Sequence, residues 1–268
     1  RSERKGVCMM QEYNQFEQIQ SEQNQWLKRC KVLQQKKYRQ QYGQFVAEGL
    51  RSVTEAIENH AAEVVLIDEA HAALAEQLPK TDIPIYMVKK GLLEKTLNTV
   101  NPQGIAAIAH QMKWDWQSVA EFDQIVVIDG VQDPGNLGTI MRTALASGTQ
   151  AMLCLKGTVD LYNDKTLRST MGAVFRLPVF HIEDVDSMIR DLHRWGFALL
   201  VADIRAEQYY HQMQFPKKAA LVVSNEANGP QLIKQGDIMV KIPLYQDAES
   251  LNVAIAAGIL LYAIKTSR

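Results

Sequence analysis

The chain has 268 residues, of which 47% are hydrophobic and 22% are charged, a composition typical of a soluble globular protein. At roughly 100–200 residues per domain, this length predicts one or two domains. The 29 basic and 30 acidic residues leave a net charge of -1, so overall charge gives no indication of nucleic-acid binding. No apolar run reaches the roughly 18 residues of a membrane span.

The start of the chain and its cysteines favour a cytoplasmic location. The stretch up to Met10 lacks the apolar core of a secretory signal, and Met9 and Met10 are candidate natural starts. Cys8, Cys30 and Cys154 are odd in number and widely spaced, without partners at metal-ligand intervals. We therefore expect free thiols in a reducing compartment, with no disulfide and no metal site.

The first part of the chain predicts a small α/β domain over 21–111, after an N-terminal extension at 1–20. Within the glutamine-rich stretch 11–42, the apolar residues from Trp26 to Leu33 have the spacing of an amphipathic helix. Beyond it, predicted strands and helices alternate, as in an α/β domain. The predicted strands are 44–49, 63–68, 84–88 and 104–110, and the predicted helices are 50–59, 70–77 and 89–97.

Basic residues gather in the same part of the chain. From Lys28 to Arg51, Glu48 is the only acid. A local basic stripe can hold a phosphate backbone even on a neutral protein. A solvated helix face would explain the same charges, so both interpretations stay open at this point.

The segment 112–123 is the predicted linker. It carries Trp114 and Trp116 among polar residues. Two aromatic rings there could stack on bases, but rings that pin a junction between domains are more common, and we favour that interpretation.

From residue 124 to 268 the pattern restarts as a second domain. Its predicted strands are nearly continuous apolar runs, which is typical of a parallel sheet covered on both faces. Gly148 is well placed to end the first helix. The predicted strands are 125–129, 151–155, 179–180, 198–203, 220–224 and 239–244, and the predicted helices are 137–147, 185–195 and 251–265.

The common nucleotide and hydrolase motifs are absent. The loop 130–138 after the first strand of the second domain does not have the Gly-x-Gly-x-x-Gly spacing of a dinucleotide site. Neither a P-loop nor a Gly-x-Ser-x-Gly elbow occurs.

Three other motifs follow predicted strands, at the sheet edge where α/β proteins bind ligands. The first is 133–144 (DPGNLGTIMRTA). Its first three residues indicate a turn, and Asn136 is a predicted N-cap of the helix from Leu137. Arg142 projects about 120° from the centre of that helix's apolar side. It is either a solvated residue or a phosphate ligand, for which a guanidinium is well suited.

The second motif is 224–230 (SNEANGP), where Glu226 directly follows a buried strand and is a site candidate. The third is 242–244 (IPL) with 249–254 (ESLNVA), where Ser250 is a predicted N-cap of the following helix.

In this order and spacing, the motifs resemble those of the SpoU/TrmH family of RNA ribose 2′-O-methyltransferases, within the SPOUT superfamily. The resemblance covers Ile125 to the C-terminus and extends more weakly toward Lys36. The family form usually has Gly where Ser224 stands and Gly-Arg where Ala227 and Asn228 stand. The resemblance implies a parallel-sheet domain with a trefoil knot, S-adenosylmethionine as cofactor, no metal, and a homodimer through the catalytic domain.

The same resemblance implies roles for individual residues. Catalytic roles fall to Arg142, Asn136, Glu226, Ser250 and Asn252. Cofactor binding falls to Val223, Ser224, Asn225, Gly229, Ile242, Leu244, Ser250 and Leu251. Because arginine does not readily lose its proton in a protein, Arg142 is expected to be an electrostatic clamp. The base is left open between Glu226 and an RNA phosphate.

Residues 36–49 and 101–104 (NPQG) look like the substrate-binding domain often fused ahead of this catalytic domain, which resembles small RNA-binding ribosomal proteins. Lys36, Lys37 and Arg39 are then the expected RNA contacts. The favoured function is methyl transfer to a ribose 2′-hydroxyl of structured RNA, in particular 23S ribosomal RNA. The alternatives are a tRNA 2′-O-methyltransferase and an RNA-binding member that has lost catalysis.

Overall fold

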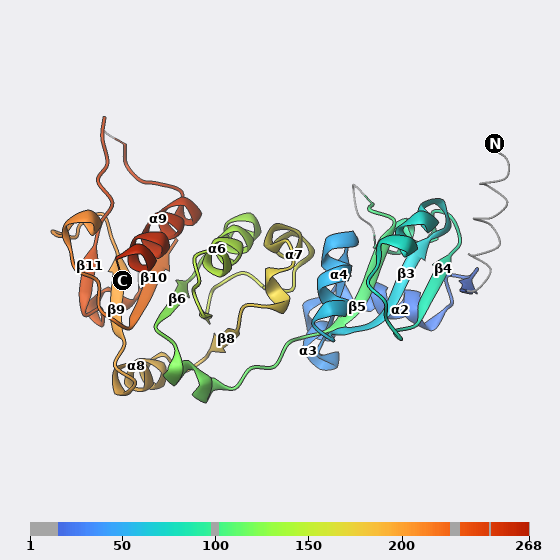
Figure 1. The fold of residues 1–268 in the computed structure, drawn as a ribbon, viewed down its shortest axis with the longest axis horizontal. Coiled ribbons are helices and arrows are strands. Elements are labelled where there is room, and N and C mark those ends of the chain that lie inside the picture. Colours follow the sequence, from blue (N-terminus) through green and yellow to red (C-terminus); the bar gives the residue numbers. More distant parts are fainter. Residues whose placement is uncertain (1–15, 98–101, 226–230, 247, 268) are drawn as a thin grey trace. The chain divides into compact units, whose positions relative to one another are not determined.

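The computed structural model of the protein describes residues 16–97, 102–225, 231–246 and 248–267. It forms two compact units, divided between Met112 and Lys113, each of which is described by itself (Figure 1). Most of the predicted N-terminal extension, with Cys8, lies outside the described residues. Among those described, no helix has the length and apolar character to cross a membrane, and no group of three potential metal ligands is present. Cys30 and Cys154 are free and buried.

The first unit is a five-stranded sheet with helices packed on it (Figure 1). Its strand order is β1-β4-β3-β5-β2, in which β5 runs antiparallel to both β2 and β3. The strands are β1 (Glu17–Ile19), β2 (Gln44–Glu48), β3 (Ala62–Asp68), β4 (Ile85–Val88) and β5 (Ile105–His110). The helices are α2 (Gln25–Leu33), α3 (Lys36–Tyr42), α4 (Leu50–Glu58), the 3-10 helix η1 (Glu69–Gln77) and α5 (Leu92–Leu97).

Most of these elements match the sequence prediction, and the misfits have local reasons. The apolar stripe from Trp26 to Leu33 forms α2, which buries Leu27, Cys30 and Leu33. β1 was not predicted, because three residues that pair through their backbone with β4 leave no periodic pattern. The segment predicted as an α-helix at 70–77 is the 3-10 helix η1, which buries none of its side chains.

The two N-terminal stretches that carry the family resemblance meet at one end of this sheet. Gly49 follows β2 and Gly104 precedes β5, and the Gly49 N–H donates to the Ile105 carbonyl at 2.9 Å. Both glycines have positive φ, +92° and +71°. A Cβ on Gly104 would lie 2.2 Å from the ring of His71, so this position accepts only glycine.

The second unit is a six-stranded sheet whose strand pairs are all parallel, as predicted. Its order is β11-β9-β10-β6-β7-β8, so the direction of winding reverses beside β6. The strands are β6 (Gln124–Asp129), β7 (Ala151–Leu155), β8 (Val179–Ile182), β9 (Ala198–Ala202), β10 (Ala219–Ser224) and β11 (Ile238–Val240). The α-helices are α6 (Pro134–Ala146), α7 (Asp164–Thr170), α8 (Val185–Arg194) and α9 (Val253–Thr266). The 3-10 helices are η2 (Trp116–Glu121), η3 (Ala173–Phe175), η4 (Tyr210–Gln212) and η5 (Gln231–Lys234).

The predicted linker at 112–123 packs largely with this second unit. Trp116 begins η2, and its indole N–H donates to Asp191 at 2.8 Å. Its ring packs against Phe180 and Trp195, with ring centroids 5.2 and 5.3 Å away. Trp116 is therefore anchored in the core of the second unit, which includes α8.

Helix α6 lies close to α7 because Gly138 has no side chain. A Cβ at that position would lie 2.4 Å from the Ser169 Cβ and 2.8 Å from the Thr166 carbonyl oxygen. Helix α9 closes the unit on its first strand. The buried Gln124 side chain donates to the Leu261 carbonyl at 3.0 Å, across a sequence separation of 137 residues.

Candidate active site

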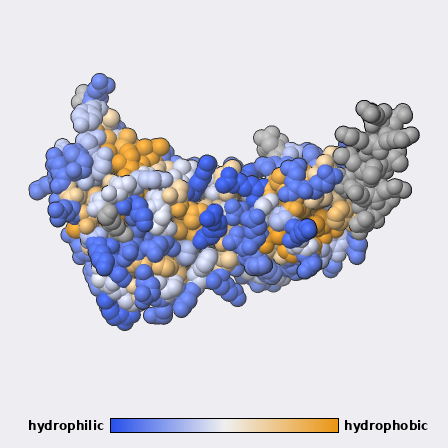
Figure 2. All heavy atoms as spheres, in the orientation of Figure 1, coloured by the Kyte–Doolittle hydropathy of each residue, from blue (hydrophilic) through white to orange (hydrophobic). Residues whose placement is uncertain are grey.

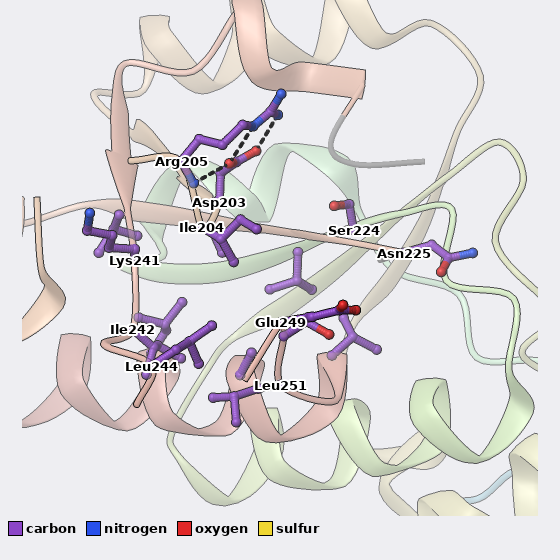
Figure 3. A pocket seen from close by; sticks show the side chains of 17 residues that line it. Asp203, Ile204, Arg205, Ser224, Asn225, Lys241, Ile242, Leu244, Glu249 and Leu251 are labelled. Carbon is purple, nitrogen blue, oxygen red and sulfur yellow. Dashed lines mark hydrogen bonds and ion pairs between the residues drawn. The ribbon is translucent and has the colours of Figure 1, made fainter. Parts of the chain in front are cut away.

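A cavity of about 740 Å³ opens at the carboxyl ends of β9, β10 and β11 (Figure 3). This edge of a parallel sheet is where α/β proteins bind ligands, and the volume suits a small molecule. Its lining combines apolar side chains with a few polar and charged ones. The lining residues are Ala202, Asp203, Ile204, Arg205, Val223, Ser224, Asn225, Val240, Lys241, Ile242, Leu244, Glu249, Ser250, Leu251, Val253, Ala256 and Leu260.

The second and third motifs build two walls of this cavity. Ser224 ends β10, and its side chain lies in the wall without closing the space, so the residue found where the family usually has Gly leaves the cavity open. Every predicted cofactor residue that the structure describes lines the cavity. Gly229, the remaining one, lies outside the described residues, as does the catalytic candidate Glu226.

The third wall was missed by the sequence analysis. It follows β9, where Asp203 is buried and the exposed Arg205 grips both of its carboxylate oxygens, with Nε–Oδ1 and Nη2–Oδ2 distances of 2.9 and 2.6 Å (Figure 3). These hydrogen bonds hold the pKa of Asp203 below its ordinary value. The available signal was only positional: a predicted strand ends at Asp203, on the same edge as the motifs.

Charge inside the cavity is mixed. Asp203 is neutralised by Arg205, and the Lys241 ammonium lies 4.6 Å from the centre of the Tyr209 ring. Glu249, the first residue of the second part of the third motif, also lines the cavity (Figure 3). Its carboxylate has no ion-pair partner within the part of the chain that the structure describes, so it is available to a cationic ligand group.

The first and third motifs meet through a pair of asparagines. The Asn252 Nδ2 donates to the Asn136 Oδ1 at 2.9 Å. The predicted N-caps need correction at both helices. Asp133 caps α6 and accepts from the Asn136 N–H, so the helix begins at Pro134 and not at Leu137.

At α9, Asn252 is the N-cap and Ser250 is not. The Asn252 Oδ1 accepts from the backbone N–H groups of Ala254 and Ile255. Asn, Asp and Ser cap helices about equally well, so composition alone could not choose between neighbours of these types. The predicted stop of α6 is confirmed, because Gly148 has φ +76° directly after the C-cap residue Ser147.

Arg142 lies apart from this pair. It is exposed on α6, opposite the buried side formed by Leu137, Ile140, Met141 and Ala144, as the helical spacing predicted. It does not line the cavity. Its expected contact with a target phosphate therefore requires that RNA or a second subunit approach the outer face of α6.

Among the predicted RNA contacts, Lys36 and Lys37 are exposed on α3 and Arg39 is not. Arg39 is 6% exposed, and its Nη1 donates to the carbonyls of Leu33 and Gln34 at 2.8 and 2.7 Å. The Arg39 guanidinium is therefore engaged within the protein, and its contact with RNA stays a prediction. The side chain satisfies carbonyls at the end of α2, which a helix leaves without intrahelical partners.

A parallel sheet, a cavity at its carboxyl edge and two of the three motifs in the lining of that cavity define a methyltransferase-type α/β domain, which follows a separate N-terminal domain in the sequence. The chain belongs to the SpoU rRNA Methylase family, which matches residues 123–262. The MRM3-like substrate binding domain matches residues 24–107.

The relatives agree over nearly the whole chain. The 23S rRNA (guanosine(2553)-2′-O)-methyltransferase RlmP of Bacillus subtilis is 35% identical over 93% of this chain and 100% of its own. The 23S rRNA (guanosine-2′-O-)-methyltransferase RlmB of Xanthomonas campestris is 30% identical over 80% of this chain and 93% of its own. The AdoMet-bound rRNA methyltransferase from Sinorhizobium meliloti superposes with a TM-score of 0.81 at 27% identity, over 94% of this chain and 98% of that one.

Proposed function

We propose that this protein transfers a methyl group from S-adenosylmethionine to a ribose 2′-hydroxyl of 23S ribosomal RNA. The observation that carries the proposal is the cavity at the ends of β9–β11, which two of the three family motifs line. The full-length match to a 23S rRNA 2′-O-methyltransferase of Bacillus subtilis supports the substrate class.

The chemistry of the cavity fits this cofactor. Val223, Ile242 and Leu244 offer apolar walls to an adenine ring, and Ser250 offers a hydroxyl to polar groups. The unpaired Glu249 carboxylate suits a molecule that carries a sulfonium and an ammonium group. When bound, the cofactor supplies an electrophilic methyl group.

The chain's own part in the reaction is alignment and charge stabilisation, because an in-line displacement depends on the geometry of its reacting centres. The Asn136–Asn252 bridge fixes two amides, one of them next in sequence to Ser250 and Leu251, which line the cavity, and from there they can orient the ribose. Arg142 holds the target phosphate and stabilises the negative charge that develops on the hydroxyl. The base remains a choice between Glu226 and an RNA phosphate.

We further propose a homodimer through α9, within a knotted catalytic domain. One side of α9 is buried in its own unit, yet Ile255 and Tyr262, seven residues apart on the opposite side, are 55% and 46% exposed. Figure 2 shows an apolar surface where Figure 1 draws α9. Burial of such a stripe against a second copy would remove apolar area from water.

Calorimetry and methylation mapping test the function. S-adenosylhomocysteine should bind and raise the melting temperature by mass action, whereas NAD should do neither. Leu244→Trp should fill the cavity and abolish this binding. The matched control is Tyr245→Trp, because its neighbour Tyr245 is 77% exposed and does not line the cavity.

The substrate is tested with tritiated cofactor on 23S rRNA and tRNA transcripts, followed by mapping of 2′-O-methyl groups. Methylation of 23S rRNA alone is expected. Methylation of tRNA instead would move the protein to the tRNA class, and cofactor binding without methylation of either RNA would mark a member that has lost catalysis.

A further inference from the structure

In the first unit, helices α2 and α3 carry a row of aromatic rings and cationic side chains. Tyr38 and Tyr42 lie one turn apart on α3, with ring centroids 6.3 Å apart and ring planes within 16° of each other. The Arg29 guanidinium, from α2, lies 3.9 Å from the centre of the Tyr42 ring, and the Lys37 ammonium lies 5.8 Å from that of Tyr38. We call Arg29, Tyr42 and Tyr38 the α2–α3 ladder.

This ladder has no part in the core of its unit. Helix α2 buries Leu27, Cys30 and Leu33 on its other side, and the core clusters of the described residues contain neither tyrosine. Among the described residues of the first unit, Tyr42 is the most exposed large hydrophobic side chain, at 40%. A face that only contacts solvent needs no aromatic rings, since polar residues such as the neighbouring Gln40 and Gln41 suffice there. Neither solvation nor core packing therefore accounts for the two aligned rings.

The ladder is held in place before any ligand arrives. The Arg29 Nη1 donates to the Gln44 Oε1 at 2.8 Å, and the Gln44 amide donates in turn to Glu63. These bonds anchor the guanidinium over Tyr42 from the start of β2. Because the groups are already ordered, a ligand that stacks on them loses less side-chain entropy than it would on a flexible surface.

The two helices that carry the ladder are cationic, and the nearby Glu63 comes from β3. Between Asn24 and Gly43 the sequence contains no acid. The exposed ammonium groups of Lys36 and Lys37 stand on the same short helix as the two rings. A surface that pairs aligned aromatic rings with cations matches the two parts of a nucleotide, the base and the phosphate.

We propose that the α2–α3 ladder is a stacking site for an unpaired base of the RNA substrate, with Lys36 and Lys37 on the adjoining phosphates. This inference rests on the proposed function, in that it takes RNA as the substrate. Bases inside a duplex hide their faces, so the site selects nucleotides in loops, bulges or single strands. It adds Arg29, Tyr38 and Tyr42 to the predicted RNA-contacting residues.

The test separates stacking from charge by their different dependence on salt. The probe is a single-stranded RNA of about 12 nucleotides with one central 2-aminopurine, and its duplex with the complementary strand serves as comparison. The Tyr38→Ala/Tyr42→Ala pair should weaken single-strand binding about 5- to 150-fold, the range for one stacked base, without changing the slope of log K against log salt. Lys36→Ala/Lys37→Ala should instead flatten that slope, by about 0.7 for each phosphate that a lysine no longer neutralises.

Matched variants keep the outcome interpretable. Tyr38→Phe/Tyr42→Phe retains both π faces and should bind and quench the 2-aminopurine like the wild type. Tyr38→Leu/Tyr42→Leu keeps apolar bulk without a π face and should lose the quenching, which covers the case in which the alanine pair does not fold. The affinity for the duplex should be the same for the wild type and for the alanine, phenylalanine and leucine variants of the tyrosine pair.

Two failures are distinguishable. If the wild type binds and quenches the single strand and the leucine pair does so equally well, the ladder is not a stacking site, while the proposed function stands. If the wild type binds neither this probe nor 23S rRNA, the proposed function is wrong, and the proposal that the ladder binds RNA is wrong with it. Binding of S-adenosylhomocysteine, measured on every variant, should not change.

Discussion

Asn252 has two tasks in the structure, and two substitutions separate them. Its Oδ1 caps α9 through the Ala254 and Ile255 N–H groups, at 2.9 and 3.3 Å, and its Nδ2 reaches Asn136 at 2.9 Å. Asn252→Ala removes both interactions. Asn252→Ser keeps a good capping oxygen, but its side chain is too short to reach Asn136.

Loss of an N-cap costs about 1 kcal/mol, within a range of about 0.5–2 kcal/mol. In a unit of this size each kcal/mol shifts the melting temperature by roughly 2–4 °C. We therefore expect Asn252→Ala to melt about 1–8 °C below the wild type and Asn252→Ser, which keeps the cap, to melt close to the wild type. Differential scanning calorimetry of the cofactor-free protein measures both shifts.

In catalytic rate, unlike in melting temperature, the serine variant should resemble the alanine variant and not the wild type. If the bridge to Asn136 holds the ribose in place, both substitutions should slow single-turnover methylation by about tenfold, the equivalent of roughly 1.4 kcal/mol of lost transition-state stabilisation. A serine variant that melts as low as the alanine variant would refute the capping role. A serine variant that methylates at the wild-type rate would refute the bridge.

Three further outcomes are expected. Arg142→Ala should lower the single-turnover rate about a hundredfold or more while RNA affinity and melting temperature stay near wild type; an unchanged rate would make it a solvated helix residue. Gly138→Ala should destabilise the fold by about 1–3 kcal/mol in urea, since its Cβ would meet the Thr166 carbonyl, whereas Gly258→Ala, whose Cβ meets only a Thr143 methyl at 3.3 Å, should be nearly neutral. The pKa of Asp203 in the folded protein is below its ordinary value of 3.8, so the ionised carboxylate stabilises the fold above pH 3.8, and this stability is lost as the pH falls through the folded pKa. The urea midpoints of Asp203→Asn and the wild type should therefore differ at neutral pH and converge in acid. A difference that stays constant with pH would contradict this.

The sequence was most informative where periodicity and motif coincide. Nearly continuous apolar runs predicted the parallel strands of the second unit, and the spacing from Trp26 to Leu33 predicted α2. Residues from both the second and the third motif line one cavity, as their positions after strands indicated. In these cases the local pattern of apolar residues directly reflects which side chains are buried, and burial contributes most to folding.

The departures from prediction share another cause. Several residues of similar chemistry could each cap a helix or face solvent, and only the tertiary structure decides which of them does. Asp133 took the cap predicted for Asn136, and Arg39 turned inward to helix carbonyls although Lys36 and Lys37 stayed in solvent. The Asp203 wall left no motif, because a single carboxylate after a strand is common. Side-chain direction, not residue type, was the missing quantity.

The bond between Gln124 and the Leu261 carbonyl constrains the order in which the protein acquires its structure during synthesis. The first unit is complete at Met112, so it can fold while the second is still being made. In the second unit, β6 emerges early, but α9, which packs against α6 and β10, is made only after 137 further residues separate the bonded pair. Contacts this distant in sequence form slowly, so apolar strands stay uncovered for longer. We therefore expect the second unit, and not the first, to set both the folding time and the tendency of the nascent chain to aggregate.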